Sequence, residues 1–195
     1  MELCARIDEA RRRWDVLKHP FYERWECGEL SRAELTFYAG EYRHAVVALA
    51  RAAGVAGDEG HAREESEHVE LWDDFAAAVD APVDREPTPE TADCAAAWSP
   101  SERFRALAVL YAIESSQPAI SRTKLAGLVE HYRFDADDPA AEYFRLHAER
   151  DVEHARAARE ALAEAPPTEV TALAAAAERA LEANRLLLDG VERAL

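Results

Sequence analysis

Strand-forming patterns, glycine and proline are all scarce in this sequence of 195 residues. Val, Ile and Thr almost never alternate with polar residues, so strands with a period of two are not expected. The chain has only 7 Gly and 9 Pro, so few positions would interrupt a helix. No apolar run approaches the roughly 20 residues of a membrane-spanning helix, and we therefore expect no membrane partner.

Cysteine is also scarce, and the three cysteines form no metal-binding or redox motif. Cys4, Cys27 and Cys94 are odd in number and contain no CxxC pattern, which indicates reduced thiols rather than a disulfide framework. The N-terminal residues Met1–Arg6 carry charges from the start and contain no apolar core of a signal peptide. We therefore expect a cytoplasmic protein.

Basic residues are few relative to acidic ones. The chain contains 23 Lys and Arg against 39 Asp and Glu, which gives a net charge of -16. Binding to nucleic acid or to an anionic membrane depends on Lys and Arg side chains that displace counterions. The charge balance therefore argues against a DNA-binding regulator, and we expect no nucleic-acid partner.

Apolar residues at helical spacing are, in contrast, present along almost the whole chain. Ser31 and Glu34 form a capping box at the start of a long helix, and His19–Pro20 and Pro118 predict interruptions. The expected helical segments are about 3–18, 21–25, 31–53, 61–79, one that starts at 89, 101–114, 120–132, 139–165 and 168–195. We predict an all-α fold in which seven or eight helices form a single bundle over residues 1–195. The long apolar last helix would suit a dimer interface, so a homodimer is one option.

One segment carries a pattern that suits a metal ion. His147, Asp151 and His154 are spaced at i, i+4 and i+7, which places the three side chains within roughly 60° of one another on a helix. Two imidazoles and a carboxylate on one stripe are typical ligands of divalent metals that prefer N and O donors. The alternative is an ordinary solvated face, since 32% of the residues are charged.

Two further helices contain residues of the same kinds. Glu65 precedes His68 by three residues and Glu64 precedes it by four, so either carboxylate shares the face of His68. Glu114 follows an apolar turn, where an unpaired buried charge would cost several kcal/mol. The alternatives are a structural histidine at His68 and a carboxylate at Glu114 that points back to water.

These residues form a candidate metal-binding set. Dinuclear sites in helical bundles draw carboxylates and histidines from several helices. Glu41, on another helix, is a further candidate ligand, although a surface position beside Arg43 is the alternative. The predicted metal ligands are Glu65, His68, Glu114, His147, Asp151 and His154, with Glu64 and Glu41 as additional candidates.

The chain also resembles a known superfamily. Glu114–Pro118 with Ile120–Lys124, followed by His147-x3-Asp151-x2-His154, resembles the haem-oxygenase-like diiron oxidases. The resemblance extends over about residues 15–162 through His19–Tyr22, Trp25, Gly28–Leu30 and His68–Trp72. Within this superfamily the chain is most similar to the CADD-like 4-aminobenzoate synthases, whose fold is related to that of the TenA and PqqC proteins.

The resemblance implies an unusual reaction. In the CADD-like branch, a centre of two Fe ions, or of Mn and Fe, activates O₂, and the protein converts its own tyrosine into 4-aminobenzoate, a folate precursor. A lysine is thought to supply the amino nitrogen. The tyrosine corresponds to Tyr22 and the lysine to Lys124. Tyr38 and Tyr42 fall where this branch carries tyrosines near the site.

Two positions depart from the family pattern. The family typically has its first glutamate seven residues before the histidine that matches His68, and position 61 is His61 here. Either a glutamate is the ligand, with Glu65 as the first candidate and Glu64 as the second, or His61 itself binds the metal. The tyrosine often found directly before the matching glutamate is Ile113 here, although Tyr111 lies one turn away.

Other functions and roles stay open on the sequence alone. One is a dinuclear-iron oxygenase that acts on a diffusible fatty acid or amine, which predicts a substrate-sized cavity beside the metals. Another is a metal-free, TenA-like ligand-binding protein. A thiaminase would need a nucleophilic cysteine, and no cysteine here matches such a pattern. The tyrosines are also compatible with plain core packing, and Lys124 with a side chain that reaches the surface.

Overall fold

The computed structural model describes residues 2–194 and, within that range, consists of nine α-helices, four short 3-10 turns and no strand. The all-α fold is confirmed, and the helix count exceeds the predicted seven or eight. The α-helices are α1 (Glu2–Arg13), α2 (Pro20–Glu26), α3 (Arg32–Ala56), α4 (Glu59–Ala78), α5 (Pro89–Trp98), α6 (Arg103–Glu114), α7 (Gln117–His131), α8 (Glu142–Ala161) and α9 (Val170–Ala194).

Each of the nine expected helical segments forms an α-helix of its own, and local capping explains why the short ones stay separate. The first helix ends at Arg13 rather than near Lys18, because the Asp15 carboxylate accepts a hydrogen bond from the Leu17 amide (3.2 Å) and starts a separate 3-10 turn. His19 Nδ1 then accepts from the Phe21 amide (3.1 Å) and caps α2 as a helix of its own. Pro118 lies in the first turn of α7, where its missing amide hydrogen costs no helical bond.

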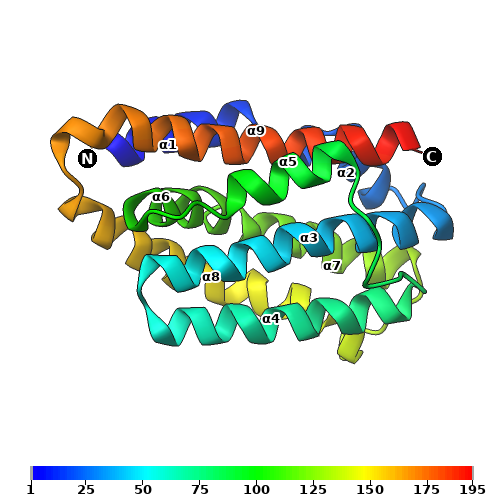
Figure 1. Cartoon of the computed structure of the whole chain (residues 1–195). Helices are drawn as coiled ribbons and strands as arrows, with labels where there is room; N and C mark the ends of the chain where they lie inside the picture. The colour runs from blue at the N-terminus through cyan, green and yellow to red at the C-terminus, as the bar shows by residue number, and fades with distance from the viewer. Residues whose placement is uncertain (1, 195) are drawn as a thin grey trace.

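The turn between α3 and α4 is tight. The capping box of Ser31 and Glu34 is present at the start of α3. Gly57 ends this helix in the left-handed conformation, with φ at 90°. Asp58 follows at once and caps α4 by accepting from the amides of Gly60 and His61. The two helices therefore form a hairpin and lie side by side, as Figure 1 shows.

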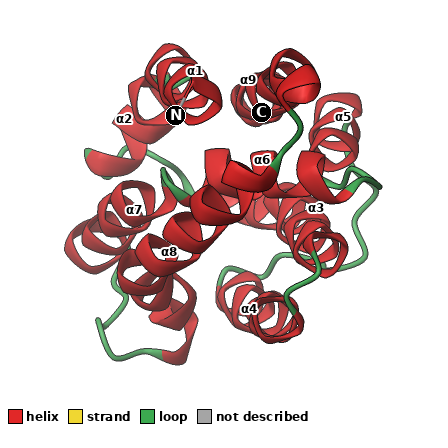
Figure 2. Ribbon diagram, turned by 90° about the vertical axis from the view of Figure 1, so that its left-hand side faces the viewer, coloured by secondary structure: helices red, strands yellow, loops and turns green. Residues whose placement is uncertain are grey.

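Helix α6 lies in the middle of the bundle. Figures 1 and 2 show α9 with α1 and α5 on one side of the molecule and α4 on the other, with α3, α6 and α8 between them. Helix α6 contacts α3, α8 and α9, and all of its residues from Ala106 to Glu114 are buried. The predicted apolar turn before Glu114 is thus the centre of the core. No described helix is long and apolar enough to cross a membrane.

Candidate metal centre

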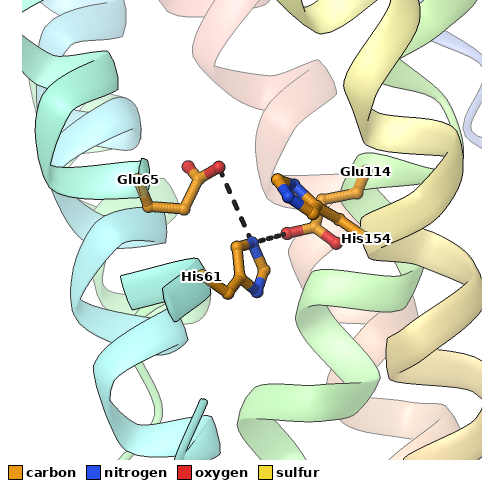
Figure 3. Close-up of side chains that lie close together, drawn as sticks. All are labelled: His61, Glu65, Glu114 and His154. Atoms are coloured by element: carbon orange, nitrogen blue, oxygen red, sulfur yellow. Dashed lines mark ion pairs between the residues drawn. The ribbon is translucent and has the colours of Figure 1, made fainter. Parts of the chain in front are cut away.

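Seven histidine and acidic side chains from three helices meet in the interior between α4, α6 and α8. The six predicted ligands lie together with His61, which the sequence offered as the alternative to Glu65, although Asp151 belongs to neither of the two groups of close ligand atoms. Figure 3 shows four of them facing one another across the gap between the helices. The seven are His61, Glu65 and His68 on α4, Glu114 on α6, and His147, Asp151 and His154 on α8.

These seven residues, the cluster, contain two groups of potential ligand atoms. In the first, ligand atoms of His61, Glu65, Glu114 and His154 all lie within 4.8 Å of one another. In the second, ligand atoms of Glu65, His68 and His147 all lie within 4.8 Å of one another. The Glu65 Oε1 atom is 2.8 Å from His68 Nδ1 and 3.7 Å from His61 Nε2. Glu65 is therefore the one side chain shared by both groups.

The histidines are arranged in two facing pairs. The rings of His61 and His154 are 4.2 Å apart, and those of His68 and His147 are 4.4 Å apart. On each of α4 and α8 the order is His-x3-acid-x2-His, and the first histidine of one helix faces the last of the other. This shared spacing in the sequence is the signal that would have identified His61 directly. Asp151 completes the α8 triplet, with its Oδ1 atom 3.9 Å from His154 Nδ1.

Hydrogen bonds outside the cluster orient two of the imidazoles. His147 Nδ1 is 2.7 Å from the carbonyl oxygen of Tyr143. Because a carbonyl only accepts, Nδ1 carries the proton and Nε2 is free for a metal. His154 Nε2 is 3.1 Å from Glu64 Oε2, which leaves Nδ1 free in the same way. Glu64 thus lies behind His154 rather than among the facing ligand atoms.

The cluster holds every buried side-chain nitrogen or oxygen atom that lacks a hydrogen-bond partner in the described part of the chain. There are nine such atoms, and all belong to these seven residues. Each unsatisfied buried polar group costs about 1–3 kcal/mol. Four of the nine lie in two ion pairs within the cluster, His61 Nε2 with Glu114 Oε1 (2.9 Å) and His68 Nδ1 with Glu65 Oε1 (2.8 Å), and the other five have no partner. Donor atoms of this kind, pointed at one another, fit metal cations.

Charges inside the cluster compete for protons. Burial raises the pKa of Glu114 to about 7, and burial together with the charges of Glu114 and Glu65 raises that of Asp151 well above its ordinary value. Burial opposes protonation of His61, but the adjacent carboxylates outweigh it and raise its pKa to about 10. Burial lowers the pKa of His147 to about 4. Protons therefore compensate part of the charge in the cluster, and a metal ion would displace them.

Glu41 is buried but lies outside the cluster. Its Oε1 atom accepts from Arg85 Nε at 2.9 Å, and its Oε2 atom accepts from both the amide and the hydroxyl of Thr88 at 2.9 Å. Both oxygens are therefore occupied, and Glu41 belongs to neither group of facing ligand atoms. The alternative of a surface position beside Arg43 is also wrong, because Arg43 pairs with Asp73.

Lys124 and the predicted tyrosines form a second buried group, which we call the cage. Lys124 does not reach the surface, because its Nζ atom lies 5.4 Å from the ring centre of Tyr22, 5.2 Å from that of Tyr38 and 4.4 Å from that of Tyr42. Two further rings, those of Trp72 and Phe144, lie within 5.6 Å of Nζ. The hydroxyls of Tyr22 and Tyr38 are 3.2 Å apart.

Burial sets the charge state of the cage. It lowers the pKa of Lys124 well below 10.5, and no acidic group compensates. It also raises the pKa values of Tyr22, Tyr38 and Tyr42. Burial therefore favours the neutral forms of the amine and of the phenols, which lie beside one another.

Aromatic contacts connect the cage to the cluster. Tyr42 packs against Trp72 (ring centres 5.0 Å apart), and Trp72 packs against Tyr143 (4.8 Å). Tyr143 stacks on His147 with 4.0 Å between the ring centres. The sequence analysis missed Tyr143, although its position four residues before His147 indicates a shared helix face. Tyr111 points elsewhere, and its hydroxyl donates to Asp8 (2.9 Å).

An all-α bundle whose interior holds paired histidines and carboxylates from facing helices has the donor set of a metal-binding helical bundle. The chain belongs to the family of iron-containing redox enzymes, whose family model matches residues 44–186. That range includes the whole cluster and Lys124.

Curated relatives and solved structures agree with this assignment. The chain is 30% identical to a 4-aminobenzoate synthase of Chlamydia muridarum, over 80% of this chain and 75% of the relative. It is also 30% identical to a 4-aminobenzoate synthase of Nitrosomonas europaea, over 90% and 85%. A TenA homolog from Pseudomonas syringae has the same fold, with a TM-score of 0.80 at 19% identity over 98% of this chain and 91% of that one. A domain of unknown function with a heme oxygenase-like fold from Shewanella denitrificans has a TM-score of 0.77 at 20% identity, over 96% and 90%.

Proposed function

We propose that this protein is a dinuclear-metal oxidase that makes 4-aminobenzoate from its own Tyr22, with Lys124 as the donor of the amino nitrogen. The observation that carries the proposal is the buried, neutral Lys124 amine, which lies in a cage of tyrosines. The similarity to 4-aminobenzoate synthases supports the same reaction.

The atoms of the product agree with these two residues as sources. The ring and Cβ of a tyrosine contain all the carbons of 4-aminobenzoate, and the amino group stands at the ring position that carries the phenol oxygen. A neutral amine has the lone pair that bond formation to carbon requires, and an ammonium does not. The lowered pKa of Lys124 therefore suits the role of donor. The new C–N bond would replace the phenol C–O bond, the Cε–Nζ bond of Lys124 and the Cα–Cβ bond of Tyr22 would break, and O₂ would be the oxidant that converts Cβ into the carboxylate.

The seven residues of the cluster are the proposed metal ligands. His61, His154 and Glu114 would hold one ion, and His68 and His147 the other, with Glu65 within reach of both. Asp151 would supply the third carboxylate. When bound, two iron ions, or one manganese and one iron, would provide the redox chemistry that consumes O₂. The hydrogen bond from His154 to Glu64 would hold that imidazole in the orientation for binding.

The cage has a direct aromatic connection to the proposed metal site. The rings of Trp72 and Tyr143 lie between Tyr42 and His147, with 5.0 Å or less between successive ring centres. These side chains would carry electrons from the tyrosines to the metal site while the apolar surroundings exclude water. This role needs no diffusible aromatic substrate.

The alternative functions fit less well. A cavity of about 190 Å³ reaches the cluster, and this volume is below the roughly 300–1,000 Å³ of most small-molecule sites. A fatty acid would therefore not fit beside the metals. A metal-free ligand-binding protein would leave five buried donor or acceptor atoms of the cluster without partners, among them both carboxylate oxygens of Asp151. A thiaminase-type nucleophile is not favoured either, because burial raises the pKa values of the Cys4 and Cys94 thiols.

The test is single-turnover mass spectrometry of the chain supplied with Fe(II), Mn(II) and O₂. Wild-type protein should release 4-aminobenzoate and lose the corresponding mass at Tyr22. Tyr22→Phe should form no product while binding as much metal as wild type. Tyr132→Phe is the matched control, since Tyr132 bonds to the Leu30 amide outside the cage, and it should still react. Product from Tyr22→Phe would rule out Tyr22 as the source.

A further inference from the structure

Exposure is unevenly distributed over the cluster. The side chains of His61 and His154 are 11% and 14% exposed, whereas those of the other five residues are at most 3% exposed. The rings of the two exposed histidines face each other at 4.2 Å. Solvent therefore reaches the cluster from one side, at this histidine pair.

The cavity of about 190 Å³ lies against the same pair, and we call it the histidine cavity. His61 and His154 are part of its lining. The lining also includes Gly57 and Asp58 of the tight α3–α4 turn and Arg103, which donates to the carbonyl of Ala56. The remaining walls are aliphatic: Leu107, Leu110, Ala157, Ala158 and Ala161.

A larger cavity elsewhere has different chemistry. It measures about 470 Å³ and is lined by Arg11, Arg12, Arg159 and Asp8, and none of the seven cluster residues contributes to it. Its charged lining suits polar solutes, whereas the aliphatic walls of the histidine cavity suit a small apolar molecule. Unlike that larger cavity, the histidine cavity touches the cluster.

We propose that the histidine cavity is the path by which dioxygen enters the metal site, and that its alanine and leucine walls exclude larger molecules. This inference rests on the proposed function, because it requires a metal-loaded cluster. The small wall residues leave room for a diatomic molecule. An external aromatic or fatty substrate would not pass, which agrees with a reaction that consumes a residue of the chain itself.

The experiment uses nitric oxide, a diatomic probe that binds Fe(II), with the full chain loaded with Fe(II) under anaerobic conditions. Iron content is measured first, and the rate of nitric oxide binding is then followed by stopped-flow absorption. Ala157→Phe and Ala161→Phe place a large ring in the wall from α8. Each variant should retain the iron content of wild type and bind nitric oxide roughly tenfold more slowly.

Two further variants keep the test specific. Ala172→Phe makes the same substitution at an exposed position of α9 that does not line this cavity, and its rate should equal that of wild type. Leu107→Ala removes wall volume and should speed binding. Unchanged rates in Ala157→Phe, Ala161→Phe and Leu107→Ala, with normal iron content, would overturn the entry path and leave the proposed function intact. Absence of iron binding in wild type would overturn the proposed function itself.

Discussion

The cluster and the cage both lie in the interior but are electrostatically opposite. In the cluster, carboxylates and imidazoles face one another, and five of their buried donor or acceptor atoms have no partner, so the interior there favours cations. In the cage, one amine is surrounded by aromatic rings and has no acidic partner, so the protonated form of Lys124 is disfavoured there. Burial alone therefore does not define the chemistry of a site. The buried groups next to a titratable side chain decide whether its charged form is stable.

Two buried glutamates show the same contrast on a smaller scale. Glu41 has both oxygens satisfied by Arg85 and Thr88, whereas Glu114 has one oxygen paired with His61 Nε2 (2.9 Å) and the other without a partner. The pKa of Glu41 is lowered despite its burial, and that of Glu114 is raised to about 7. Glu41 therefore has the hydrogen-bond partners of a structural carboxylate, whereas the surroundings of Glu114 suit a metal ligand.

The largest effect on metal content should come from Glu65, the residue that belongs to both groups of ligand atoms. Glu65→Gln removes the one carboxylate within reach of both proposed ions, so we expect metal content to fall from about two ions per chain to nearly none. Metal analysis after gel filtration measures this. Glu67→Gln, at an exposed position on the same helix, should retain the wild-type content. Full metal content in Glu65→Gln would contradict the shared-ligand assignment.

Metal binding should stabilise the cluster strongly. Mn(II) at a hundredfold excess over its dissociation constant should raise the free energy of unfolding by about 2.7 kcal/mol per site, because the ion satisfies atoms that are orphaned without it. Thermal unfolding with and without Mn(II), and again after chelation, measures the shift. Ca(II), which prefers all-oxygen ligands, serves as a control. If Mn(II) does not change the unfolding temperature, the result would argue against a metal site.

The two buried glutamates should respond in opposite directions to the same substitution. Glu41→Gln weakens a satisfied carboxylate and should lower the free energy of unfolding by about 1–3 kcal/mol without changing metal content. Glu114→Gln removes a charge from a crowded site and should stabilise the metal-free protein while reducing metal content. Denaturant unfolding of the metal-free forms at pH 8 compares them. Destabilisation by both variants would mean that Glu114 is also a structural carboxylate.

The last prediction concerns Lys124→Met, which replaces a buried amine by an apolar side chain. Because the pKa of Lys124 lies well below 10.5, this variant should raise the free energy of unfolding at neutral pH by more than the roughly 1.4 kcal/mol that corresponds to one pKa unit. In wild type, unfolding lets Lys124 take up a proton at any pH below 10.5 and above its lowered folded pKa. The unfolded state binds more protons in that range, so wild-type stability rises with pH. The advantage of Lys124→Met should therefore shrink as pH rises toward 10.5. Thermal unfolding from pH 6 to pH 10 tests this, and a constant difference would indicate an unshifted lysine.

Much of the fold and of the cluster followed from periodicity. The spacing of His147, Asp151 and His154 places them on one helix face whatever surrounds the helix, and Glu65 with His68 obeys the same rule. The choice between His61 and Glu64 did not follow, because residues three, four and seven positions apart are all close on a helix surface. The rotation of α4 against α6 and α8 selects between them, and it turns His61 inward and Glu64 toward Arg150 and His154.

The sequence by itself determined the helices, their caps and the stripes of histidine and carboxylate, because these depend on the neighbours of each residue within a few positions along the chain. Only the tertiary structure decided which buried groups found partners. Glu41 is satisfied by residues 44 and 47 positions away, and Lys124 of α7 is enclosed by rings from α2, α3, α4 and α8. The charge state of a buried side chain depends on such residues, which are distant in the sequence. Only the tertiary packing of the helices brings them together.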